Sequence, residues 1–192
     1  MDKTRQEAWE LLCEFTQSES LRKHALTVEA VMRHFAHHHQ ADEEVWGMAG
    51  LLHDFDYERF PDVNEHAKVG GRVLQERGFP GNIVHAVMAH NAATGVPRDT
   101  LLDKMVFAGD QLNGLVTATA LVRPSKSIHE VDAAAVRRKM KDKAFARNVS
   151  REDVMLGVQE LGVDLEAHTT MVIEAMKAAA ETIGLQGSAS RD

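Results

Sequence analysis

The sequence has few of the residues that mark secreted or membrane proteins. Its 192 residues include one cysteine, Cys13, so no disulfide can form within the chain. No segment approaches the roughly 20 consecutive apolar residues that cross a bilayer. The first residues, MDKTRQEAWE, lack the basic-then-apolar order of a signal peptide. These features predict a cytoplasmic protein that does not associate with a membrane.

Positive charge is also in short supply. Lysine and arginine together number 22 against 29 aspartates and glutamates, which gives a formal net charge of -7 at pH 7. Duplex nucleic acid is bound through an extended positive surface, because affinity comes from neutralised phosphates and released counterions. The composition therefore disfavours duplex nucleic acid as a partner, and a small ligand is easier to accommodate. Whether the chain forms a homo-oligomer is left open.

The strict alternation of apolar and polar residues that marks a half-buried strand is absent, and apolar residues recur at helical spacing. The length suits one hydrophobic core and is too short for two ordinary domains. We therefore predict an all-α fold, with a single domain over residues 1–185 and a flexible tail over 186–192. The expected helices cover about 4–15, 21–38, 42–53, 64–77, 81–91, 101–121, 131–145, 150–161 and 165–183. Asp42, Asn64 and Ser150 are the expected N-caps of the helices that begin near them.

Histidine, in contrast, is abundant. Seven of the eleven histidines lie between His24 and His66. Within the run His34, His37, His38 and His39, the first and third have the i, i+4 spacing of a zinc-binding pair, but no acid or cysteine elsewhere completes a site. We interpret this run as a solvated helix end.

Three other features place polar side chains where apolar ones are expected. His24 lies on the apolar stripe of its helix, His53 and Asp54 end an apolar helix, and Asp110 lies inside a long apolar helix. A buried carboxylate without a partner is costly, and an unsatisfied imidazole costs about 1 to 3 kcal/mol. Basic side chains or a divalent cation could serve as partners for these polar groups. The residues alone do not decide between the two kinds of partner.

The order of these residues resembles the ligand pattern of the HD superfamily of metal-dependent phosphohydrolases. His66 and His90 match the additional histidines of its two-metal members. The segments AGLLHD, HAKVGGRVLQERGFP and DKMVFAGDQLNGL resemble those of small HD proteins, including bacterial diadenosine tetraphosphate hydrolases. The resemblance covers about residues 21–121, which would form the HD core, with additional helices over about 127–184.

The resemblance implies one or two divalent metal ions, such as iron or manganese. His24, His53, Asp54 and Asp110 would hold the first, and Asp54 would bridge to a second held by His66 and His90. His85 competes with His90 for the last position, but five residues at about 100° each place the two on different faces of one helix. His90 lies nearer the apolar arc of that helix, so we choose His90 and expect His85 at the surface.

Further residues near these motifs are candidates for contact with substrate. His53 and Asp54 are the predicted catalytic pair, and Asp56 is a third candidate that could contact a ligand or the attacking water, or else cap the loop. Asn113 lies one helical turn beyond Asp110 and could reach the substrate. The cations proposed to bind substrate phosphate are Lys68, Arg72 and Lys104.

The basic segment over residues 137–147 has two interpretations, a solvated face and a phosphate-binding surface, of which we favour the first. The predicted function is a metal-dependent phosphohydrolase that acts on a phosphoester or phosphoanhydride of a small molecule such as a nucleotide. Two alternatives are a di-iron oxygenase of HD type and a regulatory HD protein that binds nucleotide without turning it over. The intact set of six ligands argues against the regulatory alternative.

Overall fold

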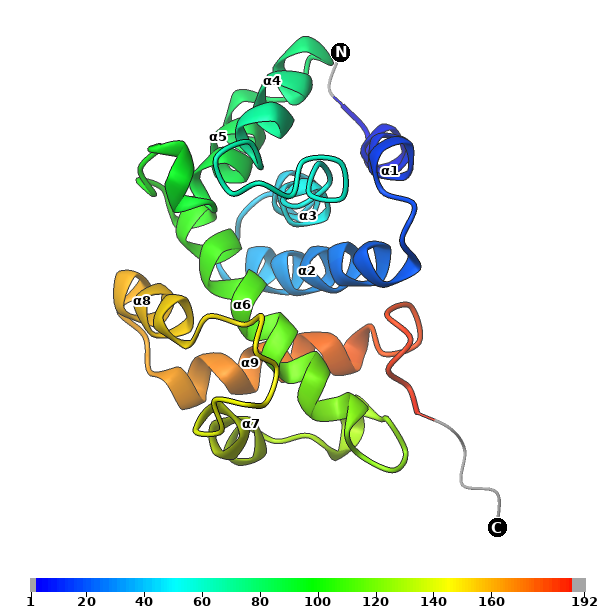
Figure 1. Ribbon diagram of the computed structural model, residues 1–192, viewed down its shortest axis with the longest axis vertical. Coiled ribbons are helices and arrows are strands. Elements are labelled where there is room, and N and C mark those ends of the chain that lie inside the picture. Colours follow the sequence, from blue (N-terminus) through cyan, green and yellow to red (C-terminus); the bar gives the residue numbers. More distant parts are fainter. Residues whose placement is uncertain (1–2, 188–192) are drawn as a thin grey trace. The chain divides into compact units, whose positions relative to one another are not determined.

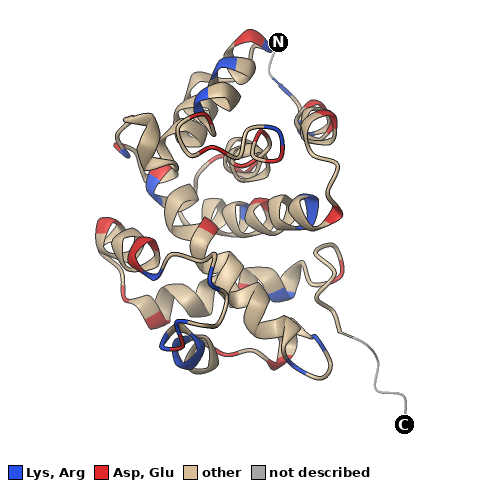
Figure 2. Cartoon of the chain, in the orientation of Figure 1, with Lys and Arg blue, Asp and Glu red and all other residues tan. Residues whose placement is uncertain are grey.

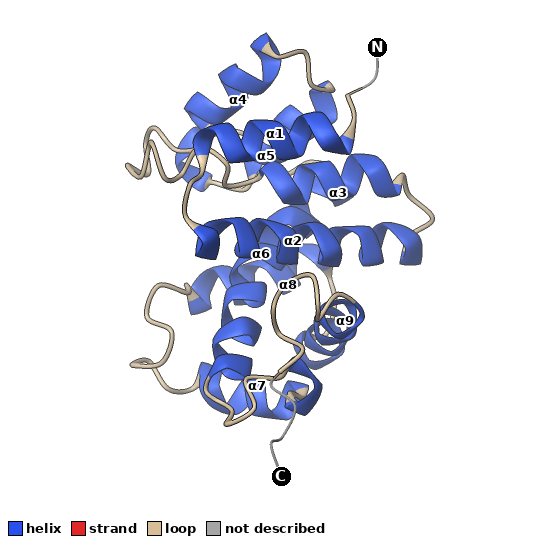
Figure 3. Ribbon diagram, turned by 90° about the vertical axis from the view of Figure 1, so that its right-hand side faces the viewer, coloured by secondary structure: helices blue, strands red, loops and turns tan. Residues whose placement is uncertain are grey.

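The computed structural model describes residues 3–187, and its secondary structure is entirely helical over that range (Figures 1 and 3). The predicted all-α fold is therefore confirmed. No helix in residues 3–187 is both long and apolar enough to span a membrane. The chain divides into two compact units, one ending at Phe107 and the other beginning at Ala108, so the predicted single domain stays a prediction.

The first unit is arranged around α3 (Glu43–Leu52), which packs against α1 (Arg5–Phe15), α2 (Glu19–His38) and α5 (Gly81–Ala89). From Trp46 to Leu52 every residue of α3 is buried, which explains its unbroken apolar sequence. Gly50 allows the close approach of α2, because a Cβ at this position would lie 2.9 Å from the carbonyl oxygen of Val28. This central helix carries the backbone directly into His53 and Asp54.

The helices of the first unit begin at polar caps that the sequence supplies locally. Thr4 and Glu7 form a reciprocal capping box at α1. The side chains of Ser18 and Asp42 accept backbone hydrogen bonds at the first turns of α2 and α3. These caps fix where α1, α2 and α3 begin, and Asp42 does so as predicted.

The fourth helix begins later than the sequence pattern predicts. We expected Asn64 as its cap, but α4 runs from Lys68 to Glu76, with Ala67 before it at a φ of 64°. Asp62 accepts hydrogen bonds from the backbone of Asn64 and His66 and holds a separate turn there. The prediction of Asn64 as a helix cap was wrong, because Asp62 organises this turn instead.

The helix α6 (Leu101–Leu121) starts in the first unit and continues into the second, with the bounds predicted from its apolar pattern. Two short 3₁₀ turns flank it, η1 (Ala92–Thr94) and η2 (Ile128–Glu130). In the second unit α9 (Leu165–Ala178) contacts α8 (Arg151–Leu161), η2 and α7 (Ala133–Met140). This packing forms the apolar centre of the second unit.

Two expected helices of the second unit are shorter than predicted. The helix expected over residues 131–145 ends at Met140, and the one expected over 165–183 ends at Ala178. The chain beyond α9 remains ordered up to Gln186, whose carbonyl oxygen accepts a hydrogen bond from Ser127. Residues 188–192 of the predicted tail lie outside the described residues.

Candidate metal centre

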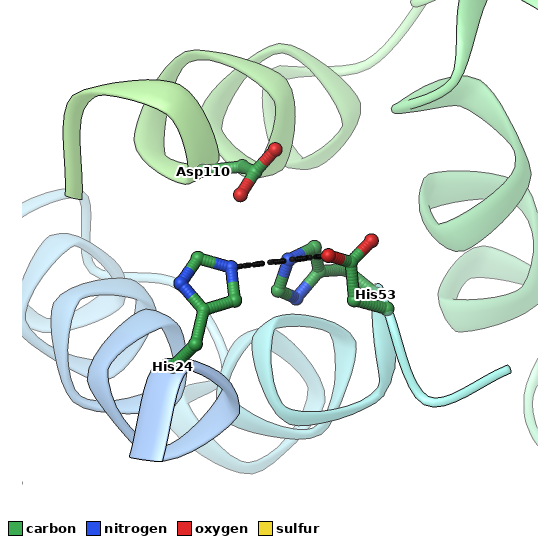
Figure 4. Close-up of side chains that lie close together, drawn as sticks. His24, His53 and Asp110 are labelled. Carbon is green, nitrogen blue, oxygen red and sulfur yellow. Dashed lines mark hydrogen bonds and ion pairs between the residues drawn. The ribbon is translucent and has the colours of Figure 1, made fainter. Parts of the chain in front are cut away.

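Two histidines from neighbouring helices meet beside Asp54. His24 lies on α2, and His53 follows the last residue of α3 and is fully buried. Their Nε2 atoms are 3.1 Å apart, and Figure 4 shows the two rings pointing toward one another. One carboxylate oxygen of Asp54, Oδ2, lies 3.5 Å from Nε2 of His53 and 3.9 Å from Nε2 of His24. These three side chains can therefore offer ligand atoms to one ion.

A second pair of histidines meets the other oxygen of the same carboxylate. Asp54 Oδ1 lies 3.0 Å from Nε2 of His66 and 3.2 Å from Nε2 of His90. The two Nε2 atoms are themselves 3.2 Å apart, and both side chains are buried. Each oxygen of Asp54 therefore faces a different pair of imidazoles, which is the arrangement of a carboxylate that can bridge two ions.

Hydrogen bonds on the outer side of three rings determine which nitrogen faces inward. Nδ1 of His53 lies 2.7 Å from the carbonyl oxygen of Gly50, and Nδ1 of His90 lies 2.5 Å from that of Val87. Both carbonyls belong to the last turn of a helix, where carbonyl groups need external donors. Nδ1 of His66 lies 2.8 Å from Oδ1 of Asp56. Because these oxygens only accept, each Nδ1 carries a proton, and Nε2 is the ring nitrogen left to bind either a second proton or a metal ion.

The inward-facing atoms have the electrostatics of a cation site. Nε2 of His66, Nε2 of His90 and Oδ1 of Asp54 are all acceptors, so the group requires an added proton or a metal ion. Ligands of one metal at about 2 Å lie roughly 3 to 3.5 Å from each other, close to the distances found. Imidazole nitrogen and carboxylate oxygen without sulfur suit first-row metals such as iron or manganese better than calcium.

The pKa values follow from the same contacts. Burial raises the pKa of the Asp54 carboxyl group, but His53, His66 and His90 outweigh that effect and hold the pKa well below its usual range. Burial lowers the pKa of His66. Hydrogen bonds and charge from Asp54 and Asp56 outweigh that effect and raise the pKa of His66 to about 9. Asp54 is therefore ionised at neutral pH, as a bridging ligand must be.

Asp56 has contacts that fit its interpretation as a capping residue. Its side chain is fully buried. Oδ1 accepts from His66, and Oδ2 accepts from the backbone amides of Ala67 and Gly70, at 3.0 and 2.7 Å. Asp56 therefore positions His66 and caps the start of α4, and its predicted catalytic role stays a prediction.

Asp110 is carried by α6, three residues beyond the end of the first unit. Because α6 is a continuous helix, Asp110 lies less than one turn after Phe107. Asn113, on the next turn, is fully buried, and within the described residues neither atom of its amide has a hydrogen-bond partner. The predicted roles of Asp110 and Asn113 remain predictions.

The predicted phosphate-binding cations lie on two helices. Lys68 and Arg72 are one turn apart on α4 and share a face, beginning two residues after His66. Lys104 lies on the first turn of α6 and is half-buried. Their contact with a substrate stays a prediction.

His85 differs in part from its expected position at the surface. Its side chain is half-buried, and Nδ1 lies 3.1 Å from a carboxylate oxygen of the buried Asp103. It is His90 and not His85 that lies beside Asp54.

Sequence reasoning missed two residues that border the site. The ring of Tyr57 lies edge-on to the ring of His66, with 5.3 Å between centroids, and remains 42% exposed. Arg98 donates to the carbonyl oxygen of Ala89, next to His90, and its guanidinium lies 3.8 Å from the ring centroid of Phe107. In the sequence, Tyr57 could be noticed only as an aromatic residue shortly after Asp54, and Arg98 only as a cation in a turn-rich loop.

Part of the chain matches a known family. Residues 21–115 match the model of the HD domain, so this part of the chain is an HD domain. Ribonuclease Y of Oleidesulfovibrio alaskensis is 28% identical over 139 residues, which are 70% of this chain and 26% of that protein. Ribonuclease Y of Desulfotalea psychrophila is also 28% identical, over 138 residues with the same coverage. The chain thus spans about a quarter of the length of these relatives, and no solved structure matches it.

Proposed function

We propose that this protein is a metal-dependent phosphohydrolase with a two-metal centre formed by His24, His53, Asp54, His66, His90 and Asp110. Two metal ions joined by a carboxylate supply a bound water of lowered pKa and neutralise charge on phosphate oxygens. The observation that carries the proposal is the convergence of three hydrogen-bond acceptors, Nε2 of His66, Nε2 of His90 and Oδ1 of Asp54, within 3.2 Å of one another.

The side chains of this site divide the work among them. Asp54 holds the two halves of the site together, because each of its oxygens faces one histidine pair. Gly50, Val87 and Asp56 hold the Nδ1 protons of the three rings that they contact, so that each Nε2 keeps its lone pair. A phosphate drawn to the centre would be oriented by nearby cations, for which we propose Lys68, Arg72, Lys104 and, from the structure, Arg98.

We propose a small phosphorylated substrate, such as a nucleotide, for this centre. The relatives are named ribonucleases, and their name says only what those proteins cleave. The net charge of -7 disfavours a duplex partner here. The exposed ring of Tyr57 beside His66 offers a surface on which a base can stack.

The test combines metal analysis with a hydrolysis screen. The purified protein would be stripped with chelator, reloaded with manganese or iron, and assayed for phosphate release from nucleotides and dinucleoside polyphosphates. We expect wild type to bind up to two metal ions and to hydrolyse at least one class, and Asp54→Ala to lose both properties. The control is His37→Ala, which removes an exposed histidine outside the site.

Two results would contradict the proposal. Hydrolysis by Asp54→Ala at the wild-type rate would remove the bridging carboxylate from the mechanism. Turnover of the iron-loaded protein that depends on oxygen, without phosphate release, would favour the oxygenase alternative instead.

A further inference from the structure

A cavity of about 610 Å³ lies within the second unit, between α7, the segment 141–149 and the start of α8. None of its lining residues belongs to the proposed metal centre. Its volume falls inside the range of small-molecule sites, roughly 300 to 1,000 Å³. Its cationic lining side chains are Arg137, Lys141, Lys143, Arg147 and Arg151, whereas Glu152 is the one carboxylate among the described lining residues.

This concentration of positive charge contrasts with the rest of an acidic chain, as the blue segments of α7 in Figure 2 show. Arg137 has a carboxylate partner, Glu166, at 3.2 Å. Among the residues that the structure describes, no carboxylate forms an ion pair with Lys141, Lys143 or Arg147. Arg137, Lys141, Lys143 and Arg147 are exposed, as the solvated-face interpretation expects, and they also line one cavity.

Arg151 organises the segment that carries these cations. Its guanidinium donates to the carbonyl oxygens of Ala146 and Val149, both at 2.7 Å, and to those of Asp142 and Phe145. These four acceptors are neutral, so they order the segment without cancelling the charge of Arg151. They also hold Ala146 at a φ of 44°, in the left-handed region. The cavity wall is therefore preorganised, which lowers the entropic cost of binding.

The start of α8 brings backbone amides to the cavity, and its first turn also carries the carboxylates of Glu152 and Asp153. Ser150 caps this helix, and Ser150, Arg151 and Glu152 all line the cavity. The first amides of a helix point out of its N-terminal end without intrahelical partners and carry a partial positive charge, which favours phosphate groups. Met140, Met155 and Leu165 supply an apolar part of the wall. Cations and an apolar surface together suit a ligand that joins phosphates to a flat organic group.

We propose that this cavity binds a nucleoside diphosphate or a similar phosphorylated nucleotide, with its phosphates among Lys143, Arg147 and the start of α8. The base contacts Met140, Met155 and Leu165. This binding needs no metal ion and does not depend on the function proposed for the metal centre.

The test uses the full chain in excess EDTA, with fluorescence anisotropy of N-methylanthraniloyl-ADP as the probe. We expect Lys143→Glu/Arg147→Glu to weaken binding by on the order of tenfold or more, because two charge-assisted contacts become repulsive. The matched control, Lys126→Glu/Arg138→Glu, makes the same change of charge at exposed cations outside the lining and should bind as wild type. Lys143→Gln/Arg147→Gln should show a smaller loss, and circular dichroism would verify the fold of each variant.

Further binding measurements show where the probe binds and which of its groups the cavity recognises. Asp54→Ala should bind the probe as wild type in EDTA, even though we expect it to be inactive. Pyrophosphate should displace the probe, and adenosine should not. The proposal is overturned if Lys126→Glu/Arg138→Glu weakens binding as much as Lys143→Glu/Arg147→Glu does. It is also overturned if Asp54→Ala abolishes binding, or if single-stranded RNA binds while the labelled ADP does not. Failure to find hydrolysis by wild type would refute the proposed function and leave this result intact.

Discussion

Replacing Asp56 by asparagine should remove one metal site while leaving the fold in place. In the wild-type protein the Asp56 carboxylate accepts one hydrogen bond from Nδ1–H of His66 and two from the backbone amides of Ala67 and Gly70. An asparagine side chain can keep the two backbone bonds through its carbonyl oxygen. Its amide nitrogen then faces Nδ1 of His66. Because the asparagine amide nitrogen can only donate, Nδ1 must become the acceptor.

The consequence is a change of tautomer. The proton of His66 moves to Nε2, which lies 3.0 Å from Asp54 and is the proposed ligand atom. A protonated Nε2 cannot bind a metal ion, so affinity at the second position should fall by about 10- to 100-fold, the usual effect of losing such an outer partner. The fold should lose roughly 1 to 3 kcal/mol, because hydrogen bonds to a charged acceptor are replaced by neutral ones.

The measurements are metal stoichiometry at limiting manganese, urea unfolding, and ¹⁵N chemical shifts of the His66 ring. Asp56→Asn should bind one ion where wild type binds two. Asp62→Asn, which alters a carboxylate that accepts a backbone hydrogen bond in an exposed turn of the same loop, serves as the control. If Asp56→Asn binds two ions with wild-type affinity, the assignment of Asp56 as the group that fixes His66 is refuted.

Two further predictions concern stability. Gly70→Ala would place a Cβ 2.9 Å from the carboxylate of Asp56. It should therefore lower the free energy of unfolding in urea by about 1 to 3 kcal/mol and weaken metal binding. Gly81→Ala, which adds a Cβ in open space, should change neither stability nor metal binding. Burial lowers the pKa of His168 to about 4 from an ordinary 6.5, so between these values the unfolded chain binds the proton more readily. Stability should therefore be complete above about pH 6.5 and decline by up to about 3 kcal/mol as the pH falls toward 4. Unfolding curves of wild type and His168→Leu at pH 7 and pH 5 test this, and an equal loss in both would exclude His168 as its source.

The sequence by itself determined the helical class and several helix boundaries, because these depend on nearby residues. The apolar pattern of Leu101–Leu121 predicted α6, and Asp42 and Ser150 act as helix caps at the positions expected from their side chains. The order of His24, His53, Asp54, His66 and His90 indicated the residues that the first unit brings together. Their role as metal ligands remains our proposal.

Only the tertiary structure decided how these residues are arranged. The partners of Asp56 lie 10 to 14 residues further along the chain, so no local pattern could distinguish a positioning carboxylate from a catalytic one. The later start of α4 and the early end of α7 likewise follow from contacts of Asp62 and Arg151 with backbone groups outside those helices. Local propensity sets where a helix can form, whereas hydrogen bonds between distant segments set which atom of each side chain faces inward.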